Sequence, residues 1–340
     1  MSAPTIKQVA QLAGVSIATV SRCLNEPDRA GQKTLAKVRA AVAELGYTPN
    51  LLAQNFRRGR TNLVMVVVPQ IGLPLFEDVL NGIKSVLGGR FSLIITKAGA
   101  DSQASNNFID MLVSKQVEGV ILLASLLPFS PQLMAINQTQ SLPLVVGLEP
   151  LTDDLEKLPG VHIDNYQAAL EATRYLIDLG HTDIAFVSGA ANSLITRDRE
   201  RGFEAAMAEA GLGIPAGFIH HSNLTLSGGA IAAQHLLRQP KAPTAIFCAN
   251  DDMALGAMSA ARRLKIDVPG QLSVMGFDDA HYAEVSNPSL STVHQPAREI
   301  GARVAERLLR EIDAPSSDAL RVETIPHKLV IRESTRRPGR

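Results

Sequence analysis

The chain has few of the residues that characterise secreted, disulfide-bonded or membrane proteins. Of its 340 residues two are cysteine, none is tryptophan, and aromatic residues make up 4%. Cys23 and Cys248 lie in unrelated segments without metal-ligand spacing, so we expect small apolar fillers rather than a metal site. No apolar run reaches membrane-spanning length, and the first residues lack the apolar core of a signal peptide. These absences predict a soluble cytoplasmic protein with no membrane partner and no metal.

Charge is balanced over the whole chain but not along it. The chain holds 33 Lys and Arg against 33 Asp and Glu. Residues 1–60 hold nine basic and three acidic side chains, which leaves +6 there (9 − 3) and −6 on the remainder. A basic N-terminal segment favours phosphate contacts, and an acidic remainder discourages other contacts with DNA. The plain alternative is a solvated surface with unevenly distributed charge.

The segment Thr5–Leu24 has the pattern of a helix-turn-helix. It reads TIKQVAQLAGVSIATVSRCL. Ala10, Gly14 and Val20 have the spacing at which a small residue lets two helices approach, a glycine permits the turn, and a branched residue fills the crossing. Residues at the start of the second helix would then face base edges in the major groove of DNA.

Capping signals delimit the helices of this segment. Thr5 and Gln8 form a capping box that opens the first helix, and Ser16 can cap the second. A third helix is predicted at about residues 33–44, where apolar residues recur at helical spacing. Together the three helices are long enough to bury a small core.

A short segment, Asn50–Phe56, follows the third helix and precedes three arginines. It is apolar at one end and basic at the other, and it is too short to be a stable helix alone. We therefore predict a hinge that folds only when it is docked.

From Leu63 onward apolar strand-like runs alternate with helical stretches. The predicted strands are Leu63–Val68, Phe91–Thr96, Gly119–Ala124, Pro143–Leu148, Asp183–Ser188, Thr244–Ala249 and Leu272–Phe277. Continuous apolar strands separated by amphipathic helices predict parallel sheets that are covered on both faces. The span is too long for one such unit, so two lobes are expected, with a ligand cleft between them.

Links near Val161–Asp164 and Thr292–Gln295 are expected to cross between these lobes. The predicted organisation is a helix-turn-helix head (1–48), a hinge (49–61) and an effector-binding and dimerisation domain (62–340). Lobe 1 is expected at about 62–161 and 294–321, and lobe 2 at about 163–291 and 323–340.

These features together resemble the LacI/GalR family of bacterial transcription regulators over essentially the whole chain. The resemblance rests on TIKQVAQLAGVSIATVSRCLN, YTPNLLAQNF, ANDDMALGAM (249–258) and MGFDDAHYAEVSNPSLSTVHQP (275–296). It implies a two-lobed, periplasmic-binding-protein-like α/β domain behind the helix-turn-helix head. The segments 108–131 and 160–165 are most similar to the cytidine-responsive repressor branch of that family.

The resemblance also implies which head residues contact DNA. Ile17, Ala18 and Arg22 are expected to read bases, the first two through apolar contacts and Arg22 through a guanine edge. The plain alternative for Ile17 is that it merely packs. The residues expected to touch phosphates, which orient the head without reading sequence, are Thr5, Ser16, Thr19, Ser21 and Asn25.

In this family the hinge helices of two subunits pair in the minor groove, and a leucine wedges into the central base step. The hinge residues expected there are Asn50, Ala53 and Phe56, and Phe56 stands in the place of that leucine. A phenyl wedge can still kink the step, although its bulk puts the preferred central step in doubt. Alternatively, Phe56 packs against the protein body.

Residue-by-residue transfer from the family predicts the effector site. The expected residues are Leu75, Phe76, Arg199, Asn223, Asn250, Asp278 and Gln295. A carboxylate and an amide suit hydroxyl recognition because they accept hydrogen bonds from vicinal OH groups. Asn223 stands where many relatives have an aromatic residue, so a stacking platform is missing or is shared with Phe76.

Plain structural alternatives remain for several of these residues. Asp278 could cap the following turn, and Arg199 could form an ion pair on a helix surface. Asp251 and Asp252 are expected to cap a helix that begins at Met253 rather than to touch ligand.

Two other classes of protein share parts of this pattern. A periplasmic sugar-binding protein would share the lobes but would have a signal peptide and no basic head. An α/β enzyme is disfavoured because no Gly-rich phosphate loop and no nucleophile elbow are present, so neither catalysis nor a cofactor is expected. The sequence therefore predicts a homodimeric repressor of a near-palindromic operator. Its effector is expected to be a nucleoside, a pentose or another sugar that releases it from DNA.

Overall fold

A computed structural model describes most of the chain, which divides into two compact units. The described residues are 4–25, 29–47, 60–69, 72–98, 102–124, 130–149, 158–190, 193–314 and 322–339. The first unit, the head, is Met1–Thr61, and the second, the body, is Asn62–Arg340. The predicted hinge residues Asn50, Ala53 and Phe56 lie outside the described residues. Among the described residues, no helix combines the length and apolarity of a membrane span.

The described part of the head is a three-helix unit, with the helices where the sequence predicted them. Its helices are α1 (Ile6–Ala13), α2 (Ile17–Asn25) and α3 (Gln32–Leu45). The capping box of Thr5 and Gln8 is present, and Gly14 ends α1 at φ 66°, a left-handed conformation that glycine adopts without strain. Val20 and Val38 are completely buried between the helices. These contacts close the small core that the apolar spacing predicted.

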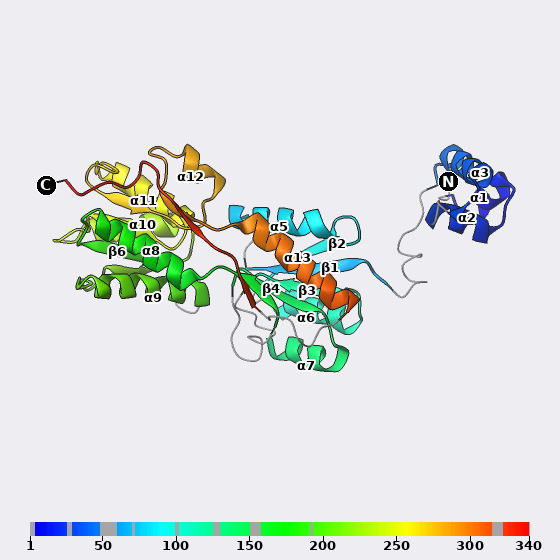
Figure 1. Cartoon of the computed structure of the whole chain (residues 1–340), viewed down its shortest axis with the longest axis horizontal. Coiled ribbons are helices and arrows are strands. Elements are labelled where there is room, and N and C mark those ends of the chain that lie inside the picture. Colours follow the sequence, from blue (N-terminus) through cyan, green and yellow to red (C-terminus); the bar gives the residue numbers. More distant parts are fainter. Residues whose placement is uncertain are drawn as a thin grey trace. The chain divides into compact units, whose positions relative to one another are not determined.

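The body contains two parallel sheets, each in its own lobe (Figure 1). The lobe 1 sheet has the order β11-β5-β4-β3-β1-β2. Its strands are β1 (Leu63–Val68), β2 (Ser92–Lys97), β3 (Gly119–Leu122), β4 (Leu144–Gly147), β5 (Gly160–His162) and β11 (Val322–Thr324). The lobe 2 sheet has the order β7-β6-β8-β9. Its strands are β6 (Ile184–Ser188), β7 (Ile219–His221), β8 (Ala245–Cys248) and β9 (Ser273–Met275).

Helices cover both faces of the lobe 1 sheet, and β1 shows why. Val64 and Val66 pack in the cluster that includes α5 (Pro74–Leu87) and α13 (Ala297–Asp313). Met65 and Val67 pack on the other face with residues of α6 (Ser102–Val113) and α7 (Ser130–Gln140). Since successive side chains of a strand point to opposite faces, a strand covered on both sides must be apolar throughout.

Lobe 2 repeats this arrangement with different helices. They are α8 (Asn165–Asp178), α9 (Leu194–Glu209), α10 (Leu226–Leu237), α11 (Asp251–Arg263) and the short α12 (His281–Val285). The buried core of this lobe includes Phe186, which stacks on Phe203 with ring centroids 5.2 Å apart. The α/β class with parallel, doubly covered sheets is therefore confirmed.

Helix α13 closes lobe 1 late in the chain. A Cβ atom at Gly82 of α5 would collide with the carbonyl of Arg298, and one at Gly301 would collide with the carbonyl of Val79. The two glycines thus let α5 and α13 touch through their backbones. On the sheet, a Cβ at Gly119 would lie 2.9 Å from the side chain of Leu308 in α13.

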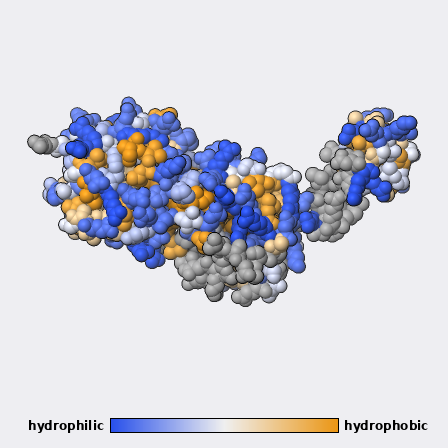
Figure 2. Space-filling model, viewed as in Figure 1, coloured by the Kyte–Doolittle hydropathy of each residue, from blue (hydrophilic) through white to orange (hydrophobic). Residues whose placement is uncertain are grey.

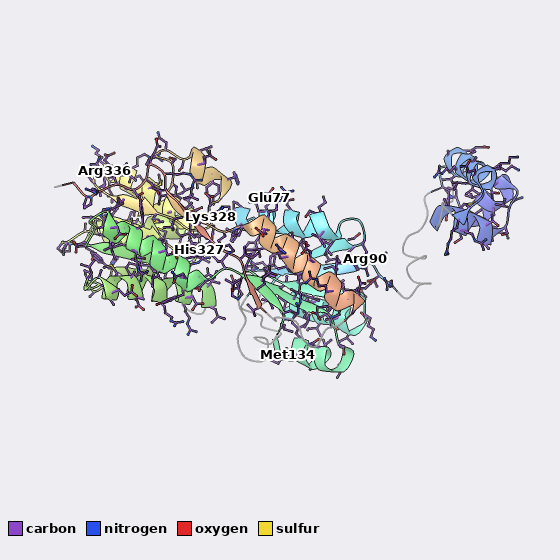
Figure 3. The ribbon with its side chains drawn as sticks, viewed as in Figure 1. Glu77, Arg90, Met134, His327, Lys328 and Arg336 are labelled. Atoms are coloured by element: carbon purple, nitrogen blue, oxygen red, sulfur yellow. The ribbon has the colours of Figure 1, made fainter. Side chains whose placement is uncertain are left out.

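A two-stranded antiparallel ribbon and the segment after β5 connect the lobes. The ribbon pairs β10 (Thr292–His294) with β12 (Lys328–Val330). Because β11 pairs with β5 in lobe 1, the last crossing follows Thr324, whereas the predicted lobe boundary lay at 321–323. His327 and Lys328 lie on this crossing segment (Figure 3).

Candidate functional site

A cavity of about 260 Å³ lies where the carboxyl ends of the two sheets meet. Its walls include Pro69 after β1 and Ala98 after β2 in lobe 1, and Ala190 after β6 and Asn250 after β8 in lobe 2. Both sheets reverse their strand order between the first and the third strand along the chain, and ligands of open α/β sheets bind outside the strand ends at such a point. The topology thus brings two binding edges to one cavity.

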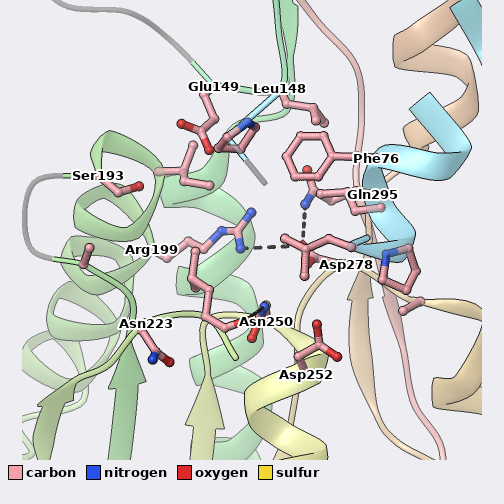
Figure 4. Close-up of a pocket in the computed structure, with 18 of the residues that line it drawn as sticks. Phe76, Leu148, Glu149, Ser193, Arg199, Asn223, Asn250, Asp252, Asp278 and Gln295 are labelled. Carbon is pink, nitrogen blue, oxygen red and sulfur yellow. Dashed lines mark hydrogen bonds and ion pairs between the residues drawn. The ribbon is translucent and has the colours of Figure 1, made fainter. Parts of the chain in front are cut away.

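All seven predicted effector residues line this cavity: Leu75, Phe76, Arg199, Asn223, Asn250, Asp278 and Gln295. Phe76, Leu148 and Glu149 reach it from lobe 1, opposite Asn223 and Asp252 of lobe 2 (Figure 4). The polar lining residues that the sequence did not identify as ligand contacts are Glu149, Ser193, Asp252 and Tyr282.

Arg199 of α9 is the buried cation of the site. Its residue surface is 2% exposed, so the alternative of an ion pair on a helix surface is wrong. Its Nε donates to Asn165 Oδ1 at 2.9 Å and its Nη1 donates to the carbonyl of Ala249. The guanidinium carbon lies 3.6 Å from the ring centroid of Phe277. Burial lowers the pKa of Arg199 and the Asp278 carboxylate opposes this, but an arginine keeps its proton in proteins.

Asp278 faces this cation from the loop after β9. Its Oδ1 lies 3.6 Å from Arg199 Nη1 and accepts from Gln295 Nε2 at 2.6 Å. Burial raises the pKa of Asp278 to about 6, against the opposing effect of Arg199. Its backbone has φ 113°, which is unusual for a residue with a side chain. Among the described residues this carboxylate accepts from the Gln295 side chain rather than capping the turn, and the N-cap of α12 is Ala280.

Asn250, at the cavity wall, caps a helix. Its Oδ1 accepts from Met253 N at 3.0 Å, and its Nδ2 donates to the carbonyl of Leu224 at 2.9 Å. Because α11 begins at Asp251, Asn250 is its cap, and the prediction of an Asp cap on a helix beginning at Met253 is wrong. The amide still has one hydrogen and one lone pair to offer a ligand.

The two aspartates after Asn250 have other partners. Asp251 is 1% exposed and accepts from Ala280 N at 2.8 Å and from Thr292 Oγ1 at 2.6 Å. Burial raises the pKa of Asp251 well above its ordinary value. Asp252 lines the cavity and accepts from the hydroxyl of Tyr282 at 2.6 Å. Burial raises the pKa of this tyrosine.

Aromatic surface reaches the cavity from Phe76 of α5 and from Tyr282 of α12. Asn223 is exposed, and its Oδ1 accepts from Thr225 Oγ1 at 2.7 Å, next to the start of α10. Phe76 therefore offers the ring surface that Asn223 does not. Across the described ranges no group of three or more His, Cys, Asp or Glu side chains has metal-binding geometry.

The predicted base-reading residues lie on one exposed face of α2. Ile17 is 44% exposed, so the alternative that it merely packs is wrong. Ala18 and Arg22 are also exposed, whereas Val20 and Cys23 are buried against the head core. The helix therefore presents the three predicted residues to solvent.

Most of the predicted phosphate contacts lie at helix starts. Ser16 Oγ accepts from Thr19 N at 3.1 Å and lies 2.8 Å from Thr19 Oγ1, which confirms Ser16 as the cap of α2. Thr5 holds the capping box of α1, and Ser21 is half-buried on α2. The side chain of Asn25 lies outside the described residues.

Two family models match the chain in the order of its two units. Residues 5–50 match the model of bacterial regulatory proteins of the lacI family. Residues 173–335 match the model of a periplasmic binding protein-like domain.

Similar proteins match along nearly the whole length. The transcriptional repressor CytR of Escherichia coli K12 is 35% identical over 336 residues, which cover 98% of this chain and 97% of CytR. The repressor PurR of Vibrio parahaemolyticus is 35% identical over 335 residues, with 98% and 99% covered.

Solved structures agree with these sequence matches. The lac repressor dimer bound to operator and the anti-inducer ONPF has a TM-score of 0.85 at 26% identity, with 98% of this chain and 100% of that chain covered. A complex of the transcriptional regulator CelR with cellobiose has a TM-score of 0.74 at 30% identity, with 97% and 99% covered.

Proposed function

Because the chain belongs to the lacI family of bacterial regulatory proteins, we propose that it is a homodimeric transcriptional repressor controlled by a small hydroxylated effector. Each head reads one half of a near-palindromic operator in the bacterial cytoplasm, since a twofold dimer matches twofold DNA. The cavity between the lobes takes the effector, and binding there releases the protein from DNA. The protein is not an enzyme, in keeping with its repressor relatives.

The observation that carries the effector class is the charge around the cavity. One cation, Arg199, faces the carboxylates of Glu149, Asp252 and Asp278. Two of the five N–H groups of Arg199 already donate to Asn165 and to the carbonyl of Ala249. A carboxylate or phosphate ligand would meet an excess of negative charge, whereas an uncharged nucleoside or sugar can donate its hydroxyl protons to these acids. A volume of about 260 Å³ suits one or two rings rather than a long chain.

A groove on lobe 2 supports the homodimer. Its lining includes the apolar residues Leu226, Leu255 and Met258 beside charged residues such as Arg262, and Val285 next to it is 78% exposed. Figure 2 shows apolar surface between hydrophilic regions on both lobes. Exposed apolar patches of this kind mark interaction sites, and the lac repressor of the matching structure is a dimer.

A thermal-shift screen of uncharged and anionic compounds tests the effector class. The panel is cytidine, adenosine, D-ribose, D-glucose and cellobiose, with D-gluconate and ribose 5-phosphate as anionic counterparts. A ligand that binds only the folded state at a hundred times its Kd contributes about 2.7 kcal/mol. We expect an uncharged compound to raise the melting temperature. A rise in melting temperature with anionic compounds alone would contradict the charge argument.

Operator binding is then tested with the compound that raises the melting temperature. Genomic fragments selected by the wild-type protein are titrated with and without that compound. Arg22→Ala is the head variant, and it should lose operator affinity while keeping the thermal shift. Equal operator affinity of the occupied and empty protein would contradict the repressor mechanism, since coupling must change both affinities by the same factor.

A further inference from the structure

Two consecutive residues after β9 point to different parts of the molecule. Asp278 faces the cavity, whereas Asp279 contacts the ribbon that connects the lobes. The Oδ2 of Asp279 lies 2.9 Å from Nδ1 of His294, and its Oδ1 accepts from Arg332 Nη2 at 2.7 Å. His294 ends β10, and Arg332 follows β12. One carboxylate thereby ties both strands of the ribbon to lobe 2.

The same place on the ribbon also serves the cavity. Gln295, the neighbour of His294, donates its amide to Asp278. The backbones are joined as well, since Asp278 N donates to the carbonyl of Val293 at 2.9 Å and Gln295 N donates to the carbonyl of Asp278 at 3.4 Å. The contacts of Asp279 with His294 and Arg332 therefore lie next to the groups that face the ligand.

The backbone of this loop needs such support. Asp278 and Asp279 have φ values of 113° and 58°, a region that residues with side chains rarely adopt. Strained conformations of this kind persist only where the surroundings hold them. The side chains of Asp279 and Arg332 are 16% and 17% exposed, so solvent screens their ion pair only partly.

We propose that Asp279, held by His294 and Arg332, is a positioning residue for the effector site, an inference that rests on the proposed function of the cavity. Its carboxylate fixes the loop that aims Asp278 and Gln295 at the ligand. It also joins that loop to both strands of the ribbon, so that movement of the ribbon and occupation of the cavity are linked.

The test compares variants of the two residues that form this contact, of which Arg332 also donates its Nη1 to the carbonyl of Leu290 at 2.8 Å. Asp279→Asn keeps a residue type that tolerates positive φ but removes the charge. Arg332→Met removes the cation, and Arg332→Lys restores it. Glu209→Gln is the matched control, because it removes a carboxylate that pairs with Arg174 on the lobe 2 surface, away from the cavity.

Two measurements on the full-length proteins decide the proposal. Calorimetric titration uses cytidine, adenosine, D-ribose, D-glucose and cellobiose as probes. Hydrogen exchange follows the segments 276–283 and 290–297. For the probe that binds the wild type, Asp279→Asn and Arg332→Met should raise Kd about tenfold or more, and Arg332→Lys should stay within about threefold. Both segments should exchange faster in Asp279→Asn, while the control variant resembles the wild type.

The outcomes separate this inference from the proposed function. Wild-type affinity and wild-type exchange in Asp279→Asn would overturn the inference and leave the effector site standing. An equal loss of affinity in Arg332→Lys and Arg332→Met would also overturn it, because a role of Arg332 in packing alone would explain that result. If no probe binds the wild type, the proposed effector class fails, and exchange in the two segments still decides whether Asp279 holds the loop.

Discussion

Replacing Asp278 by Asn should stabilise the protein while it weakens effector binding. Burial raises the pKa of Asp278 to about 6 from an ordinary value of 3.8. The folded state thus holds a proton on this carboxyl more tightly than the unfolded chain does. As pH rises from about 4 to about 6 the wild type must ionise a buried group, so its stability falls and then levels off.

The size of this effect follows from the two pKa values. A difference of one pH unit corresponds to about 1.4 kcal/mol, so ionisation of Asp278 costs at most about 3 kcal/mol at pH 8. At pH 4.5 the same relation gives about 1 kcal/mol. Asn resembles the protonated acid, can still accept from Gln295 and tolerates the positive φ of this position. The advantage of Asp278→Asn should therefore grow by about 2 kcal/mol between pH 4.5 and pH 8.

Urea unfolding followed by circular dichroism measures this difference, since the chain has no tryptophan to report by fluorescence. Glu209→Gln is again the control, because its exposed pair with Arg174 should change stability by less than about 1 kcal/mol at either pH. A pH-independent difference between Asp278→Asn and the wild type would refute the reasoning. The same variant should show a weaker thermal shift with the effector, because it lacks the carboxylate charge.

Three further changes give distinct outcomes. Phe56→Ala should weaken operator binding markedly and leave effector affinity nearly unchanged, as measured by DNA titration beside calorimetry; undiminished operator affinity would exclude a wedge at this position. Thr5→Ala removes the cap that Gln8 completes and should destabilise the head by about 1 kcal/mol, visible as earlier loss of helical signal on heating, whereas an unchanged melting curve would contradict that role. Burial lowers the pKa of His181, whose ring lies within 3.0 Å of Thr244 Oγ1, Ser273 Oγ and the carbonyl of Arg336. The folded protein therefore loses stability as pH falls below about 6.5, the ordinary value at which the unfolded chain takes up a proton. His181→Gln should flatten Tm between pH 7.5 and 5.5, and a slope equal to that of the wild type would contradict the assignment.

The sequence predicted the long apolar elements well, for a physical reason. Leu63–Val68 appears as β1 with the predicted bounds, because a strand buried on both faces must be apolar at every position. Among the described strands, β5, β11 and the two strands of the ribbon have three residues each and were not predicted. Segments this short contain too few residues to show periodicity, and their pairing partners lie far away in the chain.

The candidate site likewise contains residues that the sequence predicted correctly and residues that it did not. The family pattern predicted that Arg199 and Asp278 belong to one effector site, and both line the cavity in the structure. The prediction that Asp251 and Asp252 cap the helix was wrong, because all three side chains from Asn250 to Asp252 can accept from a backbone amide and the structure uses Asn250. The choice depends on Ala280 and Thr292, which engage Asp251 only after folding.

The late position of α13 affects how the protein emerges from the ribosome. Chains are synthesised from the N-terminus, and domains fold as their parts become available. The head and most of lobe 2 are continuous in sequence, but lobe 1 lacks one of its cover helices until residues 297–313 have been made. Until then the apolar face of the sheet that α13 covers is open to other chains. On this face Gly119 lies against Leu308 and Gly147 against Val304 in the finished fold. A nascent protein could thus fold a head able to touch DNA well before it has a cavity that any effector could fill.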